Sequence, residues 1–450
     1  MSQPTALPAT PRPSFPGAGR ALTLLLAINL FNYIDRYILA AAEPEISKEF
    51  FPNPSDSSIA DAKMGLLATA FMVSYMVLSP AFGLLADKTR RWIIIGAGVV
   101  VWSLASGASG LATTFMILFL TRILVGVGEA AYGPVAPTII ADMYPIEKRG
   151  RKLAWFYLAL PVGSAIGYGL GGIMTKHFGW RSAFYSVVIP GILLGLLSFV
   201  MKDPPRGAGA KKFKWSDLAK LRRNPSYILN TLGMTAMTFA VGGMSFWMPR
   251  YVARFRFDDP SKERLAAVSL TFGAITAVAG LLATLSGGLL GDYLRPRLKG
   301  AYFIVSGAGM LIAFPLFVAT LYVPFPAAWF LMAGAIFFIF LNTGPSNTIT
   351  ANVTAPGIRA SAYAFTIFTI HVLGDAISPP IIGFITDLTR SEARPNGNMN
   401  TSFMVVGIMI LVSGILWMLG ARFLARDEAK AEAESSDSQA TNRPSDNPTS

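Results

Sequence analysis

The chain has 450 residues, of which 53% are hydrophobic and only 14% are charged, and its mean hydropathy is +0.49. Soluble domains carry about a quarter charged residues, so this composition excludes an ordinary soluble protein. The absence of cysteine excludes disulfides and thiolate metal sites, and two histidines are too few for a histidine-rich metal centre. The net charge of +13 does not indicate a nucleic-acid partner, because in a membrane protein the location of the charge matters more.

Apolar runs divide the chain into segments close to the ~20 residues that a helix needs to cross a bilayer. We predict twelve spans, at 21–42, 63–86, 92–111, 115–141, 151–176, 181–201, 227–252, 264–290, 300–321, 326–350, 359–386 and 401–424. Lipid offers no partner to loose backbone groups, so these spans should be helices. The predicted fold class is therefore an all-α membrane protein.

Basic residues are distributed unevenly between the two sets of alternating loops, with 19 Lys and Arg on one side and 11 on the other. The richer side is expected to be cytoplasmic, which places both termini in the cytoplasm and the protein in the plasma (inner) membrane. Residues 1–20 are rich in proline, and residues 425–450 are rich in Glu, Ser, Asp and Asn. We expect both tails to be disordered, and no cleavable signal peptide is predicted.

A basic segment near the middle of the chain, at 202–226, separates residues 21–201 from residues 227–424. A loop signature recurs on either side of it. Gly83 and Asp87 follow the second span, and Gly288 and Asp292 follow the eighth, each displaced by 205 residues. Six spans, a cytoplasmic linker, six spans and a repeated loop predict two related six-helix bundles, with a substrate site near the midplane between them.

The loop Gly83-Leu-Leu-Ala-Asp87-Lys-Thr-Arg-Arg91 resembles the signature loop of the major facilitator superfamily. It departs from the pattern at Arg90, where glycine is usual, and the second copy is degenerate. The resemblance implies that Gly83, Asp87, Arg91 and Asp292 help to hold one conformational state. The alternative is a positively charged loop with a tight turn.

Four ionisable residues lie inside the apolar segments, namely Asp35 and Arg36 in the first span and Arg122 and Glu129 in the fourth. A charge at a helix centre costs roughly 2.5–3.5 kcal/mol on insertion scales, so such groups usually face a cavity and are paired. Arg122 and Glu129 are two helical turns apart and share a face. Asp35 and Arg36 are about 100° apart around their helix.

From these positions we expect Arg36 and Arg122 to contact an anionic headgroup, because arginine stays charged and matches carboxylate or phosphate. Asp35 and Glu129 are predicted to take up and release protons, with Glu129 also in contact with the substrate. The alternatives are a structural ion pair within the fourth span, and a brace between the first span and the fourth.

A narrower resemblance covers most spans of both halves. Asn32-Tyr-Ile-Asp35-Arg36-Tyr37 and Arg122-Ile-Leu-Val-Gly-Val-Gly-Glu129-Ala-Ala-Tyr132 are similar to Spinster-like lipid transporters, as are Phe246-Trp247-Met-Pro249 and His371-Val-Leu-Gly-Asp375-Ala-Ile-Ser-Pro379. The resemblance implies an amphipathic anionic lipid as cargo, such as a lysophospholipid or a phosphorylated sphingoid-like lipid.

His371 and Asp375 are four residues apart on the eleventh span, so His371 is a third candidate for proton coupling. The alternative is a hydrogen-bonded packing role. The expected aromatic walls of the cavity are Tyr33, Tyr37, Tyr132, Phe239 and Trp247.

No nucleophile elbow, phosphate-binding Gly-x-x-x-x-Gly-Lys-Ser/Thr loop or His–Glu metal pattern occurs in the sequence. We therefore expect no enzymatic activity, no cofactor and no metal, and a gradient rather than ATP as the energy source. The sequence predicts a secondary-active, proton-coupled carrier that works as a monomer in the lipid bilayer by alternating access. One alternative changes the cargo to a small organic anion or drug, another is a receptor that does not transport, and an enzyme acting on lipid is the weakest.

Overall fold

The computed structural model describes residues 15–52, 59–205, 221–355 and 358–441. The linker residues 206–220 and the outermost tail residues lie outside this part, so the predictions made for them are not addressed. Helices occupy all twelve predicted positions, and within the described residues ten helical stretches are long and apolar enough to cross a membrane. Two of the predicted spans are not among these ten. They are 115–141, where the helix is interrupted, and 227–252, where the helix carries more polar side chains.

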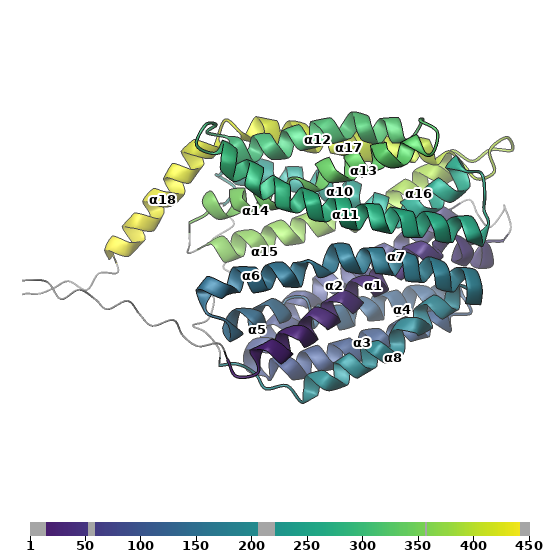
Figure 1. Ribbon diagram of the computed structural model, residues 1–450, viewed down its shortest axis with the longest axis horizontal. Coiled ribbons are helices and arrows are strands. Elements are labelled where there is room, and N and C mark those ends of the chain that lie inside the picture. The colour runs from purple at the N-terminus through teal and green to yellow at the C-terminus, as the bar shows by residue number, and fades with distance from the viewer. Residues whose placement is uncertain (1–14, 53–58, 206–220, 356–357, 442–450) are drawn as a thin grey trace, which may run out of the picture.

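The first half of the chain forms eight helices: α1 (Ala18–Phe50), α2 (Ala60–Lys88), α3 (Arg91–Gly110), α4 (Phe115–Ala130), α5 (Ala136–Met143), α6 (Ile146–Tyr157), α7 (Ala159–Phe178) and α8 (Trp180–Phe199). The second half forms α10 (Pro225–Arg250), the π-helical segment η1 (Tyr251–Arg256), α11 (Lys262–Leu294), α12 (Ala301–Thr320), α13 (Ala327–Phe340), α14 (Thr343–Asn352), α15 (Arg359–Ile370), the π-helical segment η2 (His371–Asp375), α16 (Ser378–Leu388) and α17 (Met399–Gly420). Figure 1 shows the two groups as two bundles lying one on the other, with α7 beside α11 at the seam.

Two of the predicted spans are interrupted close to a proline. The fourth span is divided into α4 and α5 by a turn that contains Pro134. In the eleventh span, α15 passes through η2 into α16, whose first turn contains Pro379. Proline cannot donate the helical hydrogen bond. At the second break, side chains satisfy two backbone carbonyls, because Thr69 donates to that of Ala376 at 2.5 Å and Trp247 donates to that of Pro379 at 2.8 Å.

The C-terminal segment, expected to be disordered from residue 425, is instead a helix, α18 (Leu424–Thr441). Leu424 and Ala431 are buried, and Asp427 accepts a hydrogen bond from the backbone N–H of Ser226 at 3.0 Å. This carboxylate satisfies an orphan donor in the first turn of α10 and so attaches the tail helix to the second bundle.

We call the membrane side that holds the start of α1 and the end of α17 the terminal side, and the opposite side the distal side (Figure 1). The two bundles meet closely in their distal halves. A Cβ atom added to Gly65 at the distal end of α2 would lie 2.5 Å from the backbone of Pro379, whereas one added to Gly83 at the terminal end would meet nothing within 4 Å. The described contacts therefore close the distal side.

The seam between α7 and α11 depends on small residues. A Cβ added to Gly172 would lie 3.0 Å from Ala266, and one added to Gly273 would lie 3.0 Å from Ala165. Gly163, Gly167 and Gly171 place the neighbouring face of α7 equally close to α1. Small residues at four-residue spacing allow helix backbones to approach in a membrane, and here they let α7 contact both bundles.

Candidate functional site

The centre of the first bundle contains an ion pair between α1 and α4. Arg36 Nη2 lies 2.6 Å from Glu129 Oε2, and Arg36 Nε donates to the same oxygen at 2.8 Å. The Glu129 side chain is fully buried, whereas 22% of the Arg36 side chain is exposed. The guanidinium lies 5.3 Å from the ring centre of Tyr33, 4.8 Å from that of Phe71 and 5.3 Å from that of Tyr75. Three aromatic faces therefore hold this cation beside its carboxylate.

A polar cavity of about 190 Å³ borders this pair. It is lined by Asn29, Asn32, Tyr33, Arg36, Tyr75, Glu129, Tyr132, Gly133, Pro137, Phe156, Tyr157 and Ile367. All but Ile367 come from the first bundle, and they lie on the terminal side of the contact between the bundles. The volume suits a headgroup rather than a whole lipid, since sites for drug-sized ligands span about 300–1,000 Å³.

Of the predicted aromatic walls, Tyr33 and Tyr132 line this cavity. The Tyr132 hydroxyl donates to the carbonyl of Leu25 at 2.7 Å, which fixes its orientation. Glu129 Oε1 has no hydrogen-bond partner among the described residues. An unpaired buried carboxylate oxygen is costly, so this atom is a natural position for a proton.

Asp35 and Arg122 lie close together in the buried interior of the first bundle, away from the polar cavity. Asp35 is 1% exposed and Arg122 is 2% exposed, and neither lines the polar cavity. The hydroxyl of Ser106 on α3 donates to Asp35 Oδ1 and accepts from Arg122 Nη2 at 3.3 Å. Arg122 Nη2 also donates to Ser109 Oγ at 2.7 Å. The structure thus divides the four predicted charges into one couple at the cavity and one behind it.

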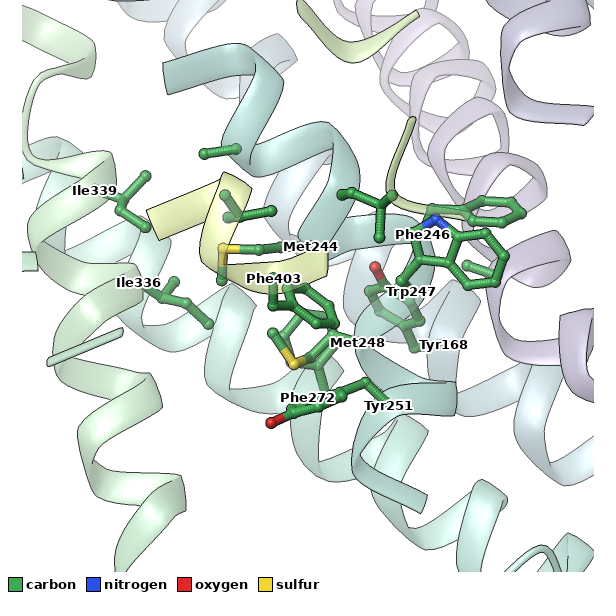
Figure 2. Close-up of a cluster of buried hydrophobic side chains, with 14 of the residues drawn as sticks. Tyr168, Met244, Phe246, Trp247, Met248, Tyr251, Phe272, Ile336, Ile339 and Phe403 are labelled. Carbon is green, nitrogen blue, oxygen red and sulfur yellow. The ribbon is translucent and has the colours of Figure 1, made fainter. Parts of the chain in front are cut away.

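The remaining predicted aromatic residues, Tyr37, Phe239 and Trp247, do not line the polar cavity. Tyr37 lines a mostly apolar cavity between the bundles, together with Leu160, Ser164, Val241, Met244, Ser245, Phe272, Thr276, Ile336, Ile339 and Phe340. Phe239 is 4% exposed and lines neither cavity. Trp247 is fully buried among the side chains drawn in Figure 2, and its indole N–H donates to the carbonyl of Pro379 at 2.8 Å. In this state Trp247 therefore joins α10 to α16 and lines neither of the two cavities described above.

His371 and Asp375 form a pair within η2. His371 Nδ1 lies 3.0 Å from Asp375 Oδ1, and their side chains are 26% and 18% exposed. The π-helical turn brings Asp375 against Gly242 of α10, where an added Cβ would lie 2.5 Å from the Asp375 Cβ. The histidine lines neither of the two cavities described above.

The residues of the repeated loop lie at the terminal ends of their helices. Arg91 Nη1 pairs with Asp142 Oδ2 of α5 at 2.5 Å, and the backbone N–H of Arg91 donates to Asp203 Oδ2 at 2.9 Å. In the second copy, Asp292 accepts from the Tyr302 hydroxyl at 2.8 Å. Asp87 and Gly83 both lie near the end of α2, and a Cβ added to Gly83 would meet nothing within 4 Å. The Arg91 contacts described here stay within the first half of the chain.

A second cluster of charges, which the sequence did not reveal as a unit, joins the two bundles at the distal side. Arg250 Nη1 of α10 lies 2.8 Å from Glu43 Oε1 of α1 and 2.7 Å from Asp61 Oδ1 of α2. Arg390 Nη2, just after α16, lies 2.8 Å from Asp61 Oδ2. Glu43, Asp61 and Arg250 are at most 2% exposed. Every pair named here crosses between the bundles.

Asp387 of α16 completes this distal cluster. Its Oδ2 accepts from the backbone N–H of Ala62 at 2.9 Å, and its Oδ1 accepts from that of Asp61 at 3.3 Å and pairs with Arg390 Nε at 2.9 Å. The residue before α2, Ile59, provides no side-chain cap. A carboxylate of the second bundle therefore caps a helix of the first.

No group of three or more metal-ligating side chains that could hold a metal ion occurs in the described ranges. The site consists of one ion pair at the edge of the polar cavity, one sealed acid–arginine couple and a distal charge cluster. Charges placed in this way suit binding and conformational change.

Comparison with known proteins agrees with this arrangement. Residues 25–379 match the model of the Major Facilitator Superfamily. The chain is 34% identical to human Protein spinster homolog 1 over 450 residues, which cover 93% of this chain and 83% of that protein. It is 33% identical to the Sphingosine-1-phosphate transporter SPNS2 of Danio rerio, over 90% of this chain and 84% of that protein.

Solved structures share the fold. A bacterial homolog of the human lysosomal transporter Spinster, in an inward-facing and occupied conformation, superposes with a TM-score of 0.78 at 22% identity, over 92% of this chain and 99% of that one. A D-xylose-proton symporter superposes with a TM-score of 0.70 at 15% identity, over 88% and 96% of the two chains. With the fold, the buried charge pairs and these identities together, the chain belongs to the Spinster-like subgroup of the Major Facilitator Superfamily and is a multi-pass membrane transporter rather than an enzyme.

Proposed function

We propose that this protein is a secondary-active, proton-coupled transporter of an amphipathic anionic lipid, such as a lysophospholipid or a sphingoid-phosphate-like lipid. The observation that carries the proposal is the Arg36–Glu129 pair at the polar cavity. Arginine remains a cation at any physiological pH, whereas a carboxylate can be neutralised by a proton. The strength of the competition for Arg36 is therefore set by protonation of Glu129.

Protonation of Glu129 and binding of the headgroup then favour one another, because ionised Glu129 and the headgroup compete for Arg36. While Glu129 is ionised, it occupies the guanidinium of Arg36. A proton on Glu129 releases the guanidinium, which can then form paired hydrogen bonds with a phosphate or carboxylate headgroup. The Tyr33, Phe71 and Tyr75 rings keep the cation in place during the exchange. Loss of the headgroup returns Arg36 to Glu129 and favours release of the proton.

An amphipathic cargo is supported by the contrast between the two cavities. The cavity at Arg36 is lined by tyrosines, asparagines and charges, while the cavity at Tyr37, which is only about 20 Å³ in this state, is lined chiefly by apolar side chains of the second bundle. Met244, Phe272, Ile336 and Ile339 are among these side chains and are drawn in Figure 2. Tyr37 follows Arg36 in the sequence, so the two cavities meet the same turn of α1. One relative carries the name of a sphingosine-1-phosphate transporter, which supports a phosphorylated lipid as cargo.

Alternating access would come from rocking of the two bundles about this site. The distal cluster holds the bundles together in the present state, and the cavity lies toward the terminal side. Because the terminal side carries 19 loop Lys and Arg residues against 11, we assign it to the cytoplasm, with the protein a monomer in the plasma (inner) membrane.

Transport of radiolabelled lysophosphatidic acid into proteoliposomes, with and without a pH gradient, tests this function. Arg36→Ala should reduce flux by at least tenfold, and Glu129→Gln should remove the response to the gradient. Arg264→Ala is the matched control, because this arginine lies at the distal surface, is 41% exposed and pairs only with the neighbouring Asp259 among the described ion pairs. Unchanged flux and pH response in both site variants would contradict the proposal.

The size of the polar cavity favours one alternative, a small organic anion. About 190 Å³ holds a small carboxylate completely, whereas a lipid must extend beyond it. The same proteoliposomes loaded with succinate distinguish the two. Saturable succinate flux that lysophosphatidic acid does not inhibit would support the small anion.

A further inference from the structure

The Ser106 hydroxyl links Asp35 to Arg122, two residues that form no direct ion pair in the described part of the chain. No Lys, Arg or His nitrogen of the described residues lies within the 4.0 Å limit of an ion pair from an Asp35 carboxylate oxygen. Instead, the Ser106 hydroxyl donates to Asp35 Oδ1 while its oxygen accepts from Arg122. A hydroxyl has one proton and two acceptor positions, so it can serve both neighbours at once.

Arg122 is held back from Asp35 by its own bonds. Its Nη2 donates to Ser106 and, at 2.7 Å, to Ser109, and these serines are three residues apart on one face of α3. Ser109 donates in turn to Thr121 at 2.8 Å, and the guanidinium lies 5.2 Å from the ring centre of Phe184 on α8. The guanidinium cannot reach the carboxylate without breaking these contacts.

Two buried atoms of this couple remain unsatisfied. Asp35 Oδ2 and Arg122 Nε have no hydrogen-bond partner among the described residues, although both residues are at most 2% exposed. A buried polar atom without a partner carries a desolvation cost, so each one needs a physical explanation. The couple is therefore arranged so that a change in charge on Asp35 has a large effect.

We propose that Ser106 is the positioning residue through which the protonation state of Asp35 is communicated to Arg122. With Asp35 ionised, the Ser106 proton is directed at the carboxylate and its oxygen accepts from Arg122. When Asp35 takes a proton, the new O–H can donate to Ser106, and the Ser106 proton turns away to another acceptor. No covalent bond changes, and the one added proton stays on Asp35. The inference rests on the proposed proton coupling, but it concerns a residue outside the cavity.

The groups that act on Asp35 are few. Arg36 is its chain neighbour, and Arg122 and Glu129 face it from α4. In the part of the chain that the structure describes, α3 contributes only hydroxyl groups to its hydrogen bonds, and α7 packs on α1 through Gly163, Gly167 and Gly171. Removing the Ser106 hydroxyl should therefore change the titration of Asp35 more than any other uncharged substitution nearby.

Infrared titration of the reconstituted protein tests the role without a transport substrate. A protonated carboxyl group has its own C=O stretching band, and the band that disappears in Asp35→Asn is assigned to Asp35. Ser106→Val should move the pH midpoint of this band by about one unit toward higher pH, because the ionised form loses the hydrogen bond that stabilises it. Ser106→Thr, which has nearly the same size and keeps a hydroxyl, should leave the midpoint close to that of the unmodified protein.

Three further variants make the result decisive. Ser103→Ala removes another buried hydroxyl of α3, which donates to the carbonyl of Val99 in its own helix at 2.7 Å, and should not move the midpoint. Ser109→Ala removes one of the hydrogen bonds that hold Arg122 away from Asp35, so it should move the midpoint toward lower pH, opposite to Ser106→Val, while reducing lysophosphatidic acid flux. Ser106→Ala repeats the Val test without added bulk. Equal midpoints for the Thr and Val variants, or an equal shift with Ser103→Ala, would overturn the proposal, whereas failure of the Arg36 and Glu129 variants to alter transport would overturn the proposed function alone.

Discussion

Asp35 and Arg36 are adjacent in the chain, yet their side chains lie in different surroundings. Arg36 binds Glu129 at the edge of the polar cavity, whereas Asp35 is linked to Arg122 through Ser106 in the buried interior. The rotation of about 100° between neighbouring helical residues produces this separation. One turn of α1 therefore contributes to two charge couples that differ in their access to water.

Replacing the Glu129 carboxylate should destabilise the ligand-free protein and increase the stabilisation that a bound anionic lipid provides. Glu129→Gln leaves Arg36 without its counter-charge, at a cost of about 1–2 kcal/mol because the arginine keeps some contact with solvent. We expect a lower melting temperature and a larger rise on adding lysophosphatidic acid than in the unmodified protein, both measured by thermal unfolding. Asp259→Asn, at an exposed loop carboxylate, is the control and should change neither value. A Glu129→Gln protein as stable as the original would argue against the pair.

Breaking the distal cluster should open the distal side. Arg250→Gln removes the cation that lies between Glu43 and Asp61, so two buried carboxylates of the first bundle lose their partner from the second. The native chain has no cysteine, so spin labels at Phe178→Cys and Leu388→Cys, both exposed near the distal ends of α7 and α16, report the distance between bundles. The distance distribution should broaden toward longer values. The same labels in Arg264→Gln should give the original distribution, and an unchanged Arg250→Gln distribution would show that the cluster does not hold this state.

The two glycines of α2 should differ sharply in their tolerance of a side chain. Gly65→Ala places a Cβ 2.5 Å from the backbone of Pro379, so α2 and α16 must separate, whereas Gly83→Ala finds open space. With Ala266→Cys as a buried reporter in the seam between α7 and α11, Gly65→Ala should increase labelling by a maleimide severalfold. Gly83→Ala should leave labelling near the original rate. Equal labelling in both variants would mean that the close contact at Gly65 does not keep the distal side shut.

The tail helix should contribute to stability through one carboxylate. Asp427→Ala removes the acceptor for the Ser226 N–H at the start of α10, and loss of a helix cap costs about 0.5–2 kcal/mol. Thermal unfolding should show a modest decrease that Glu434→Ala, at an exposed position of the same helix, does not reproduce. An Asp427→Ala protein with unchanged stability would mean that α18 contributes nothing through this contact.

The sequence was sufficient to predict the helices and the four central charges, because hydrophobic length and the cost of intramembrane charge are both local properties. It did not reveal which charges would pair. Arg122 and Glu129 share a face of α4, but two turns separate them by about 11 Å, and α3 reaches only the first of them. Ser106 and Ser109 gave no signal, since serines are common in apolar helices.

The distal cluster was beyond prediction for a different reason. Glu43, Asp61, Arg250, Asp387 and Arg390 all lie near the ends of predicted spans, where charges are usual and need no partner. Their pairing depends on how the bundles are placed, which no local pattern encodes. Trp247 illustrates the same limit, because its aromatic character suited a cavity wall equally well as the interior where it lies.

Because Asp387 belongs to one bundle and the first turn of α2 to the other, separation of the bundles would uncover backbone amides as well as charges. The amide hydrogens of Asp61 and Ala62 would then exchange with solvent deuterium more quickly whenever the distal side opened. Hydrogen–deuterium exchange at the beginning of α2, measured by mass spectrometry, would therefore report how often the distal side opens in the unlabelled, unmodified protein.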